Sequence, residues 1–277
     1  MNALQNRVAL VTGASRGAGR GIALALADRG ATVYVTGRSA RGGATTENLA
    51  GTVEETARLI TERGGTGIAV RCDHTDDADV ERLFQRIGAE HGRLDLLVNN
   101  VWGGYEGHEG AGFVAPFWEQ PMRHWDGMFV AGLRAHIVAG RLAVPLMLPQ
   151  RSGLIVNTVA WDRGLYLGNL FYDVAKAAIV RLAFAMAQEL KPHGVVAVAL
   201  APGFMRTERV MQAHAEHPLD LLRTESPEYA GRVIAAMAAD PDVARLSGGV
   251  HHAGDLAPHY GVTDIDGRLV PPFRIDE

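Results

Sequence analysis

The stretch Thr12-Gly13-Ala14-Ser15-Arg16-Gly17-Ala18-Gly19 decides the fold of this chain. It follows a short apolar run at residues 7–12 and leads into residues 17–29, where apolar residues recur at the spacing of a helix. A glycine-rich turn between a strand and a helix lets the chain reverse sharply and lets a pyrophosphate touch the backbone. The N–H groups and the positive dipole end of the helix then face the phosphates. The turn therefore predicts a nucleotide site formed by Gly13, Ser15, Arg16, Gly17, Ala18 and Gly19.

Strand and helix signals alternate along most of the chain. The predicted strands are residues 7–12, 32–36, 67–72, 95–99, 153–157 and 195–200, and the predicted helices are 17–29, 51–63, 76–90, 121–148 and 171–190. Strands separated by helices of this length pair in parallel through right-handed crossovers. Apolar strands without polar alternation indicate a sheet covered on both faces. We expect an α/β, Rossmann-type fold with one domain over residues 1–277, a doubly wound parallel sheet in a three-layer αβα sandwich.

Three long loops interrupt this alternation, at residues 37–50, 101–120 and 203–227. Long loops inside a compact domain are commonly functional. We expect residues 201–277 to hold a substrate loop and a C-terminal extension. Residues 255–277 are interpreted as either a tail or a cover over a neighbouring subunit.

The composition excludes several classes of protein. Of the 277 residues, 47% are hydrophobic and 21% are charged, and the net charge of −4 gives no general attraction to nucleic acid or to an anionic membrane. No apolar stretch is judged to approach the ~20 residues of a membrane span, and residues 1–7 lack the features of a signal peptide. We expect a cytoplasmic protein with no membrane or nucleic-acid partner.

The cysteine and histidine residues give no sign of a cross-link or a metal site. The one cysteine, Cys72, excludes an intrachain disulfide and ends an apolar run, which indicates a buried strand residue. His251 and His252 are adjacent, so a strand would point them to opposite faces, and His108 is a lone loop residue. The sequence therefore predicts no metal.

Five motifs occur in an order that resembles the short-chain dehydrogenase/reductase family, over about residues 7–210. The glycine turn reads T-G-x-x-x-G-x-G, and the other four are Cys72-Asp73, Asn99-Asn100-Val101-Trp102-Gly103 (N-N-A-G in the family), Tyr172-Asp173-Val174-Ala175-Lys176 (Y-x-x-x-K) and Pro202-Gly203-Phe204-Met205-Arg206-Thr207 (P-G-x-x-x-T). The resemblance implies that the cofactor is also bound by Asp73, Asn100, Tyr172, Lys176, Pro202, Gly203 and Thr207.

Tyr172 and Lys176 are the predicted catalytic pair. They are four residues apart on a predicted helix and therefore share one face. A free phenol has a pKa of about 10, and a nearby ammonium lowers that pKa. The resemblance implies that Tyr172 donates a proton to a carbonyl oxygen as hydride arrives from C4 of the nicotinamide, while Lys176 holds the ribose hydroxyls.

Two polar partners that the family places beside this pair are absent. The family has a Ser thirteen residues before the Tyr, where this chain has Val159, and an Asn in the long helix, where this chain has Gly132. Losing one such donor typically costs about 10²–10³ in rate. Strand alternation turns Thr158 away from the missing Ser's direction, which leaves loop residues as further candidates: Tyr105, Asp162 and Tyr166.

Gly132, together with the run Phe117-Trp118-Glu119, resembles the subgroup typified by the animal dehydrogenase/reductase family member one. That subgroup keeps the glycine turn and the Y-x-x-x-K motif but varies the rest of the tetrad. The resemblance to this subgroup adds little about the substrate.

The end of the second strand bears on the choice of nicotinamide cofactor. NAD-binding folds usually carry an acid ~20 residues past the glycines, whereas this strand ends Thr36-Gly37-Arg38. A carboxylate would repel a 2′-phosphate, and a guanidinium would pair with it through two hydrogen bonds. Arg38 and Arg16 therefore predict NADP(H), with NAD(H) as the less favoured alternative.

Two functions remain open on the sequence alone. The leading interpretation is an NADP(H)-dependent carbonyl reductase or alcohol dehydrogenase acting on a small molecule. Val159 and Gly132 leave open a nucleotide-binding sensor or scaffold protein with little or no catalysis.

The resemblance also implies a homodimer or homotetramer built through the helices at residues 121–148 and 171–190. Six loop aromatics predict a pocket for a bulky apolar carbonyl compound, or else simply pack the loops: Trp102, Tyr105, Phe113, Phe117, Trp118 and Trp161.

Overall fold

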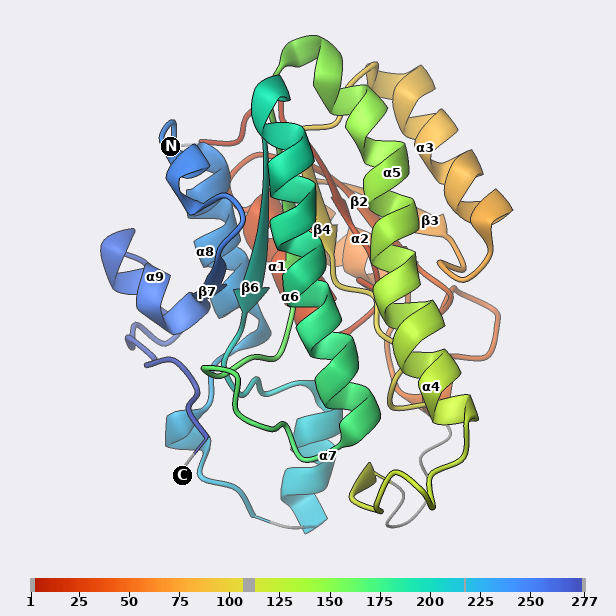
Figure 1. Ribbon diagram of the computed structural model, residues 1–277. Coiled ribbons are helices and arrows are strands. Elements are labelled where there is room, and N and C mark those ends of the chain that lie inside the picture. Colours follow the sequence, from red (N-terminus) through yellow and green to blue (C-terminus); the bar gives the residue numbers. More distant parts are fainter. Residues whose placement is uncertain (1–2, 107–112, 217, 276–277) are drawn as a thin grey trace.

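Seven apolar segments form one parallel sheet in the computed structural model, which describes residues 3–106, 113–216 and 218–275 (Figure 1). The strands lie in the order β3-β2-β1-β4-β5-β6-β7, so the sheet grows outward from β1 in both directions, which confirms the doubly wound arrangement. They are β1 (Val8–Val11), β2 (Thr32–Gly37), β3 (Thr66–Arg71), β4 (Leu96–Asn99), β5 (Gly153–Thr158), β6 (Val195–Ala201) and β7 (Val250–His252).

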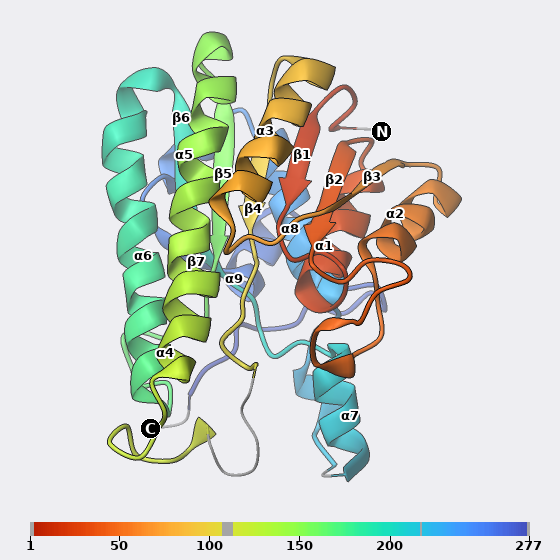
Figure 2. The ribbon, with the colours of Figure 1, turned by 90° about the vertical axis from the view of Figure 1, so that its right-hand side faces the viewer.

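Helices cover both faces of this sheet, which Figure 2 shows from the side. Side chains alternate along a strand, so in β1 Ala9 and Val11 face one layer while Val8 and Leu10 face the other. The first layer contains α1 (Gly17–Ala27), α2 (Val53–Glu62), α8 (Pro227–Ala239) and α9 (Ala253–His259). The second contains α3 (Asp77–His91), α5 (Ala135–Met147) and α6 (Leu170–Leu190). This double cover explains why the strands carry few polar residues.

A side-chain cap fixes where α6 begins. The Asn169 carboxamide oxygen accepts a hydrogen bond from the backbone N–H of Tyr172 at 2.9 Å. Such a cap satisfies one of the backbone N–H groups that the first turn of a helix leaves unpaired. Because α6 follows β5, its first turn lies at the carboxyl ends of the strands. The cap therefore places Tyr172 at the edge of the sheet where parallel α/β folds bind ligands.

The helix predicted at residues 121–148 is not uniform. It consists of α4 (Arg123–Met128), a π-helical turn (Phe129–Arg134) and α5. Turns of this kind are frequent at functional sites, and this one contains Gly132.

The same helical stretch corrects one expectation from the sequence. Residues 123–150 form a 28-residue stretch with a mean hydropathy of 1.3 in its most apolar part, which is long and apolar enough to cross a membrane. The prediction that no stretch approaches this length was therefore wrong. Small residues break up the apolar pattern in the sequence, but Ala139, Ala143 and Met147 of this stretch are buried against the sheet.

The last third of the chain is more regular than the sequence suggested. Residues 203–227, predicted to be irregular, contain α7 (Glu208–Glu216). The elements α8, β7 and α9 were not predicted, because their Ala- and Gly-rich segments show little periodicity. The terminal segment packs on its own chain, with Tyr229 Oη donating to the carbonyl oxygen of Val270 at 3.1 Å.

Candidate active site

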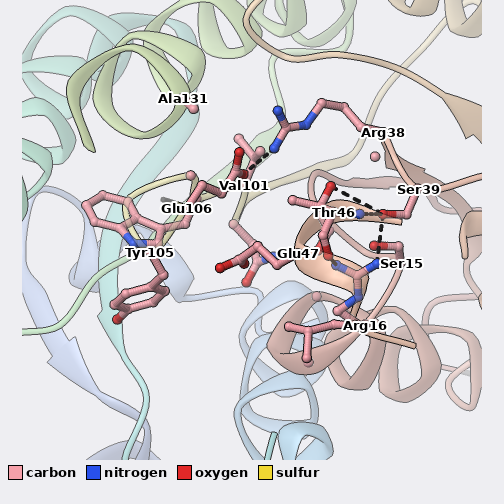
Figure 3. A pocket seen from close by; sticks show the side chains of 18 of the residues that line it. Ser15, Arg16, Arg38, Ser39, Thr46, Glu47, Val101, Tyr105, Glu106 and Ala131 are labelled. Atoms are coloured by element: carbon pink, nitrogen blue, oxygen red, sulfur yellow. Dashed lines mark hydrogen bonds and ion pairs between the residues drawn. The ribbon is translucent and has the colours of Figure 1, made fainter. Parts of the chain in front are cut away.

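A pocket lies beyond the carboxyl ends of β1, β2 and β4. It is formed by the glycine turn, the loop after β2, the end of β3, the loop after β4 and the start of α7. Figure 3 shows labelled side chains of the glycine turn, the loop after β2 and the loop after β4 facing one another across it. Of the residues predicted to bind a cofactor, those lining it are Gly13, Ser15, Arg16, Gly17, Ala18, Gly19, Arg38, Asp73, Asn100 and Thr207.

The glycine turn has the geometry that a phosphate cradle requires. Gly13 adopts φ +68°, and a Cβ at this position would lie only 2.8 Å from Val101 Cα. Only glycine accommodates both conditions without strain. The Asn100 carboxamide holds the turn by donating to the carbonyl oxygens of Thr12 at 2.9 Å and Gly13 at 3.1 Å. Asn100 therefore shapes the turn as well as lining the pocket.

A carboxylate from α7 sits on the first turn of α1. The backbone N–H of Gly17 donates to Glu208 Oε2 at 2.8 Å, and Arg20 lies 3.7 Å from the other carboxylate oxygen. The helix dipole and an unpaired N–H make this position favourable for any anion. Sequence analysis missed Glu208, although an acidic residue directly after the P-G-x-x-x-T motif is a signal that could have revealed it.

The two arginines of the pocket play different roles. Arg16 uses its whole guanidinium on the loop after β2, donating to Ser39 Oγ at 2.7 Å and to the carbonyl oxygens of Thr46, Ala50 and Gly51 at 3.0–3.1 Å. Burial lowers the pKa of Arg16 below its ordinary value. It shapes the wall of the pocket from within.

Arg38 instead reaches across the pocket and forms an ion pair with Glu106, as Figure 3 shows. The Arg38 side chain is 36% exposed, so solvent and a ligand can approach it. Glu106 was not identified from the sequence, since nothing in the chain order links the loop after β4 to the end of β2.

Four further predicted residues divide into two that line the pocket and two that do not. Asp73 lines the pocket and accepts hydrogen bonds from the N–H and hydroxyl of Thr75. Thr207 also lines it. Pro202 and Gly203 are not among its lining residues, and the Glu225 carboxyl lies against Gly203, where a Cβ would come within 2.6 Å of Glu225 Oε2.

Tyr172 and Lys176 lie one turn apart on α6, as predicted, behind the loop after β4. Lys176 is 7% exposed, and its Nζ lies 5.2 Å from the centre of the Tyr172 ring. The same ammonium lies 3.5 Å from the centre of the Trp102 ring. Trp102 and Tyr105 both line the pocket, so they connect the catalytic pair with the nucleotide end.

Burial controls the protonation of both members of the pair. It raises the pKa of Tyr172 well above 10, with a further increase from Tyr105, and it lowers the pKa of Lys176 to about 7. The prediction that Lys176 lowers the pKa of Tyr172 was therefore wrong for this structure. A lysine with a pKa of about 7 is only partly charged at neutral pH, so it stabilises a phenolate less than a fully charged ammonium would.

Five of the six predicted loop aromatics divide into two groups, whereas the sixth, Trp161, packs against the apolar cluster that contains Val159. Trp102 and Phe113 each make an edge contact with Tyr172 at 5.5 Å between ring centres, and Tyr105 lies at 6.2 Å. Phe117 and Trp118 instead contact each other and are 50% and 72% exposed. Only the first group, from the loop after β4, surrounds the catalytic pair.

The structure distinguishes the four residues that the sequence offered as replacements for the missing hydrogen-bond donor. Thr158 donates its hydroxyl to the carbonyl oxygen of Asn99 at 3.2 Å, and Tyr166 is 62% exposed. Asp162 is held by Arg274 and by the backbone N–H of Ile275. Tyr105 alone of the four contacts the catalytic phenol, with its Oη donating to Tyr172 Oη at 3.3 Å.

These residues fit a nicotinamide dinucleotide. The glycine turn exposes backbone without large side chains. The backbone N–H of Gly17 in this turn already binds an anion, the Glu208 carboxylate. The end of β2 carries Arg38 and Ser39 and no acid. Lys176 and Tyr172, which were also predicted to bind the cofactor, do not line this cleft but contact Trp102 and Tyr105, which do. Among the described residues, no three His, Cys, Asp or Glu side chains lie close enough together to hold a metal ion.

Comparison with known proteins agrees with this geometry. Residues 7–218 match the family model described as short chain dehydrogenase. The chain is 41% identical to mouse (Mus musculus) dehydrogenase/reductase SDR family member 1 over 98% of its own length and 87% of that protein.

Solved structures agree as well. A putative dehydrogenase from Xanthomonas campestris superposes with a TM-score of 0.81 at 25% identity, covering 99% of this chain and 97% of the other. A metagenomic short-chain oxidoreductase in complex with NADP gives a TM-score of 0.69 at 25% identity, covering 90% and 98%. Motifs, topology and relatives agree, and this chain belongs to the short-chain dehydrogenase/reductase family.

Proposed function

We propose that this protein is an NADP(H)-dependent oxidoreductase that reduces a carbonyl compound or oxidises the corresponding alcohol. The observation that carries the proposal is the placement of Tyr172 and Lys176 on one face of α6, in contact with Trp102 and Tyr105, which line the cleft that begins at the glycine turn. A bound nicotinamide would supply or accept the hydride. The chain's own residues must then position the substrate oxygen and move one proton.

Tyr172 is suited to act as an acid. Its pKa lies above 10, so at neutral pH it keeps its proton at Oη, ready for a carbonyl oxygen placed beside it. This protonation state favours the reductive direction. Lys176, with a pKa of about 7, exists in both forms near neutrality and can return a proton towards the phenol after it is lost.

The pocket also supports a preference for NADP(H) over NAD(H). Arg38 is the partly exposed guanidinium at the end of β2, and a 2′-phosphate there would compete with Glu106 for its donors. A structural neighbour of this chain was solved with NADP. The aromatic residues Trp102, Tyr105 and Phe113 favour a bulky apolar substrate.

A screen of NADPH oxidation against ketones and quinones tests the proposal. Wild type should consume NADPH with at least one class of carbonyl compound, and Tyr172→Phe should not. NADPH binding without turnover on any carbonyl would favour the second candidate, a nucleotide-binding sensor or scaffold. The apolar surroundings of Val159, which packs with Ile179 and Ala183, are the observation that keeps this candidate open.

We also propose that the protein is cytoplasmic and forms a homodimer or homotetramer through α5 and α6. Ile137 and Phe184, on these two helices, are 43% and 38% exposed, although Ala175, Ala183 and Ala187 of α6 face the core. Sedimentation at micromolar concentration should give a mass of two or four chains, and Phe184→Glu should reduce it.

A further inference from the structure

One short segment of the loop after β4 contacts both catalytic side chains. Trp102-Gly103-Gly104-Tyr105 is separated from the end of β4 only by Asn100 and Val101, and its two aromatic residues contact the two catalytic side chains. Trp102 lies over Lys176, and Tyr105 contacts the hydroxyl of Tyr172. We refer to residues 102–105 as the WGGY segment.

Trp102 and Gly132 are complementary in shape. A Cβ on Gly132 would lie 2.6 Å from Trp102 Cζ3 and 2.7 Å from Cε3, so the indole occupies the volume that any larger residue at 132 would need. Gly132 belongs to the π-helical turn, whose irregular backbone borders this ring. The absence of a side chain at Gly132 and the indole of Trp102 are therefore sterically matched.

The indole contacts the ammonium through its face. Trp102 Nε1 is buried and has no hydrogen-bond partner among the described residues, so the ring is not held by its polar group. In the described part of the chain, Lys176 Nζ makes no hydrogen bond or ion pair, and the ring centre lies 3.5 Å away. A cation over the face of a tryptophan is attracted by the ring quadrupole, most strongly when both are removed from water.

Tyr105 supplies the hydroxyl that Val159 lacks. Val159 is buried in an apolar cluster with Ile179 and Ala183, where a polar side chain would find no partner. The Tyr105 hydroxyl lies 3.3 Å from that of Tyr172, which is the position from which a second donor could share one substrate oxygen. The guanidinium of Arg209 lies 5.3 Å from the Tyr105 ring and helps to hold it.

We propose that the WGGY segment replaces the two missing members of the tetrad, with Trp102 holding the Lys176 ammonium and Tyr105 donating the second hydrogen bond to the substrate oxygen. The catalytic part of this inference rests on the function proposed above. Trp102 acts on the reaction only through Lys176, so it is a positioning residue. Tyr105 touches the substrate and is a catalytic residue in this scheme.

Lysine NMR tests the position of Trp102 without any turnover. The chain has two lysines, Lys176 and Lys191, so labelling with [13Cε]lysine gives two signals, assigned by Lys191→Arg. The Lys176 Hε protons should be shifted upfield by the indole ring and should lose that shift in Trp102→Leu. Trp118→Leu, which removes an exposed indole, should keep it. A Lys176 signal that is the same in Trp102→Leu and wild type would overturn the inference.

An exchange of the two residues tests the same claim through activity. Gly132→Asn alone should clash with the indole and lose most activity, and Trp102→Gly alone should leave Lys176 unsupported. Combined, Trp102→Gly/Gly132→Asn should reduce the carbonyl at least tenfold faster than either single variant. A double variant no better than the worse single variant would contradict the inference, and the lysine spectrum reports whether each variant is folded.

Tyr105→Phe tests the second donor. It removes one hydroxyl, so kcat should fall on the order of a hundredfold while the NADPH dissociation constant changes less than threefold. Tyr166→Phe removes an exposed hydroxyl and should leave both values unchanged. An unchanged kcat in Tyr105→Phe would exclude Tyr105 as a donor. If wild type reduces no carbonyl at all, the proposed function fails, whereas the lysine experiment still decides the role of Trp102.

Discussion

At the glycine turn the chain keeps the residues of its family, whereas around Tyr172 it keeps two members of the tetrad and replaces two. The nucleotide end is polar: its walls are held by Arg16 and the Arg38–Glu106 ion pair, and an anion already sits on Gly17. The reaction end is aromatic, with Trp102 and other rings around the catalytic pair.

The difference follows from what each end must bind. A pyrophosphate is recognised by backbone N–H groups, which cannot be replaced by side chains of another type. A positioned ammonium needs only a partner of suitable charge distribution, and a polar amide or an aromatic face can provide it. The nucleotide end therefore tolerates little change, while the reaction end can be rebuilt.

Tyr172→Phe gives the largest expected effect and separates the two ends. Turnover should fall by about 10³, because general acid catalysis by one side chain contributes rate factors of this order. The NADPH dissociation constant should change less than threefold, since the phenol lies beyond the glycine turn. Fluorescence titration and steady-state kinetics on the same preparation measure both, and equal losses in binding and turnover would show that the two ends are not separable.

Arg38→Asp should act only at the nucleotide end. Removing a charge-assisted pair and adding a repelling carboxylate should weaken NADPH binding about 100-fold, with much less effect on NADH. Arg41→Asp, on the exposed side of the same loop, is the matched control. Equal losses for NADPH and NADH would refute the assignment of Arg38 to the 2′-phosphate.

Unfolding at different pH values should detect the buried Lys176. Its pKa in the folded state is about 7, below the 10.5 of an unfolded chain, so the unfolded state binds the extra proton between these values. Stability contributed by this group therefore rises with pH in that window, and the wild-type protein should gain on the order of 2 kcal/mol relative to Lys176→Met between pH 7.0 and 8.5.

In the difference between wild type and Lys176→Met, the contributions of other titrating groups to the free energy of unfolding cancel. Glu225, whose pKa burial raises to about 8, contributes the opposite slope, and it does so equally in both proteins. Urea denaturation at four pH values measures the difference. Parallel pH profiles for the two proteins would mean that Lys176 keeps its charge in the folded state.

Glu208→Gln should have the smallest effect, in the favourable direction. Removing the carboxylate from the N–H of Gly17 frees the anion position, so NADPH should bind about three- to tenfold more tightly, in line with the ~1 kcal/mol of a charge at a helix terminus. Glu216→Gln, at the other end of α7, should leave the affinity unchanged. Weaker binding in Glu208→Gln would show that the carboxylate supports the nucleotide site.

The fold could be predicted because its signals are local. Apolar runs, the glycine turn and the spacing of Tyr172 and Lys176 are all read within a few residues, and the structure places them together. The Glu106, Glu208 and Trp102 contacts join segments that only the folded chain brings together. No local pattern specifies such pairs. The sequence does show a large residue, Trp102, and a small one, Gly132, at two positions where the chain departs from its family, but only the structure shows that the two are in contact.

The protonation states of Tyr172 and Lys176 could not be predicted from the sequence for the same reason. Spacing on a helix brought Lys176 close to Tyr172, but burial by the loop after β4 decides which of them is charged. A loop whose aromatic residues cover the pair cannot be placed from chain order alone.

The most direct measurement uses NADPH carrying two deuterium atoms at C4, so that either face delivers the label, and a carbonyl compound that the wild-type protein reduces. Mass spectrometry should find the deuterium on the former carbonyl carbon of the product with wild type, and the transfer should be reduced about 10³-fold in Tyr172→Phe. NADPH consumption with no deuterium in the product, or equal transfer by the two proteins, would contradict the account of this site as a hydride-transfer centre completed by Tyr172.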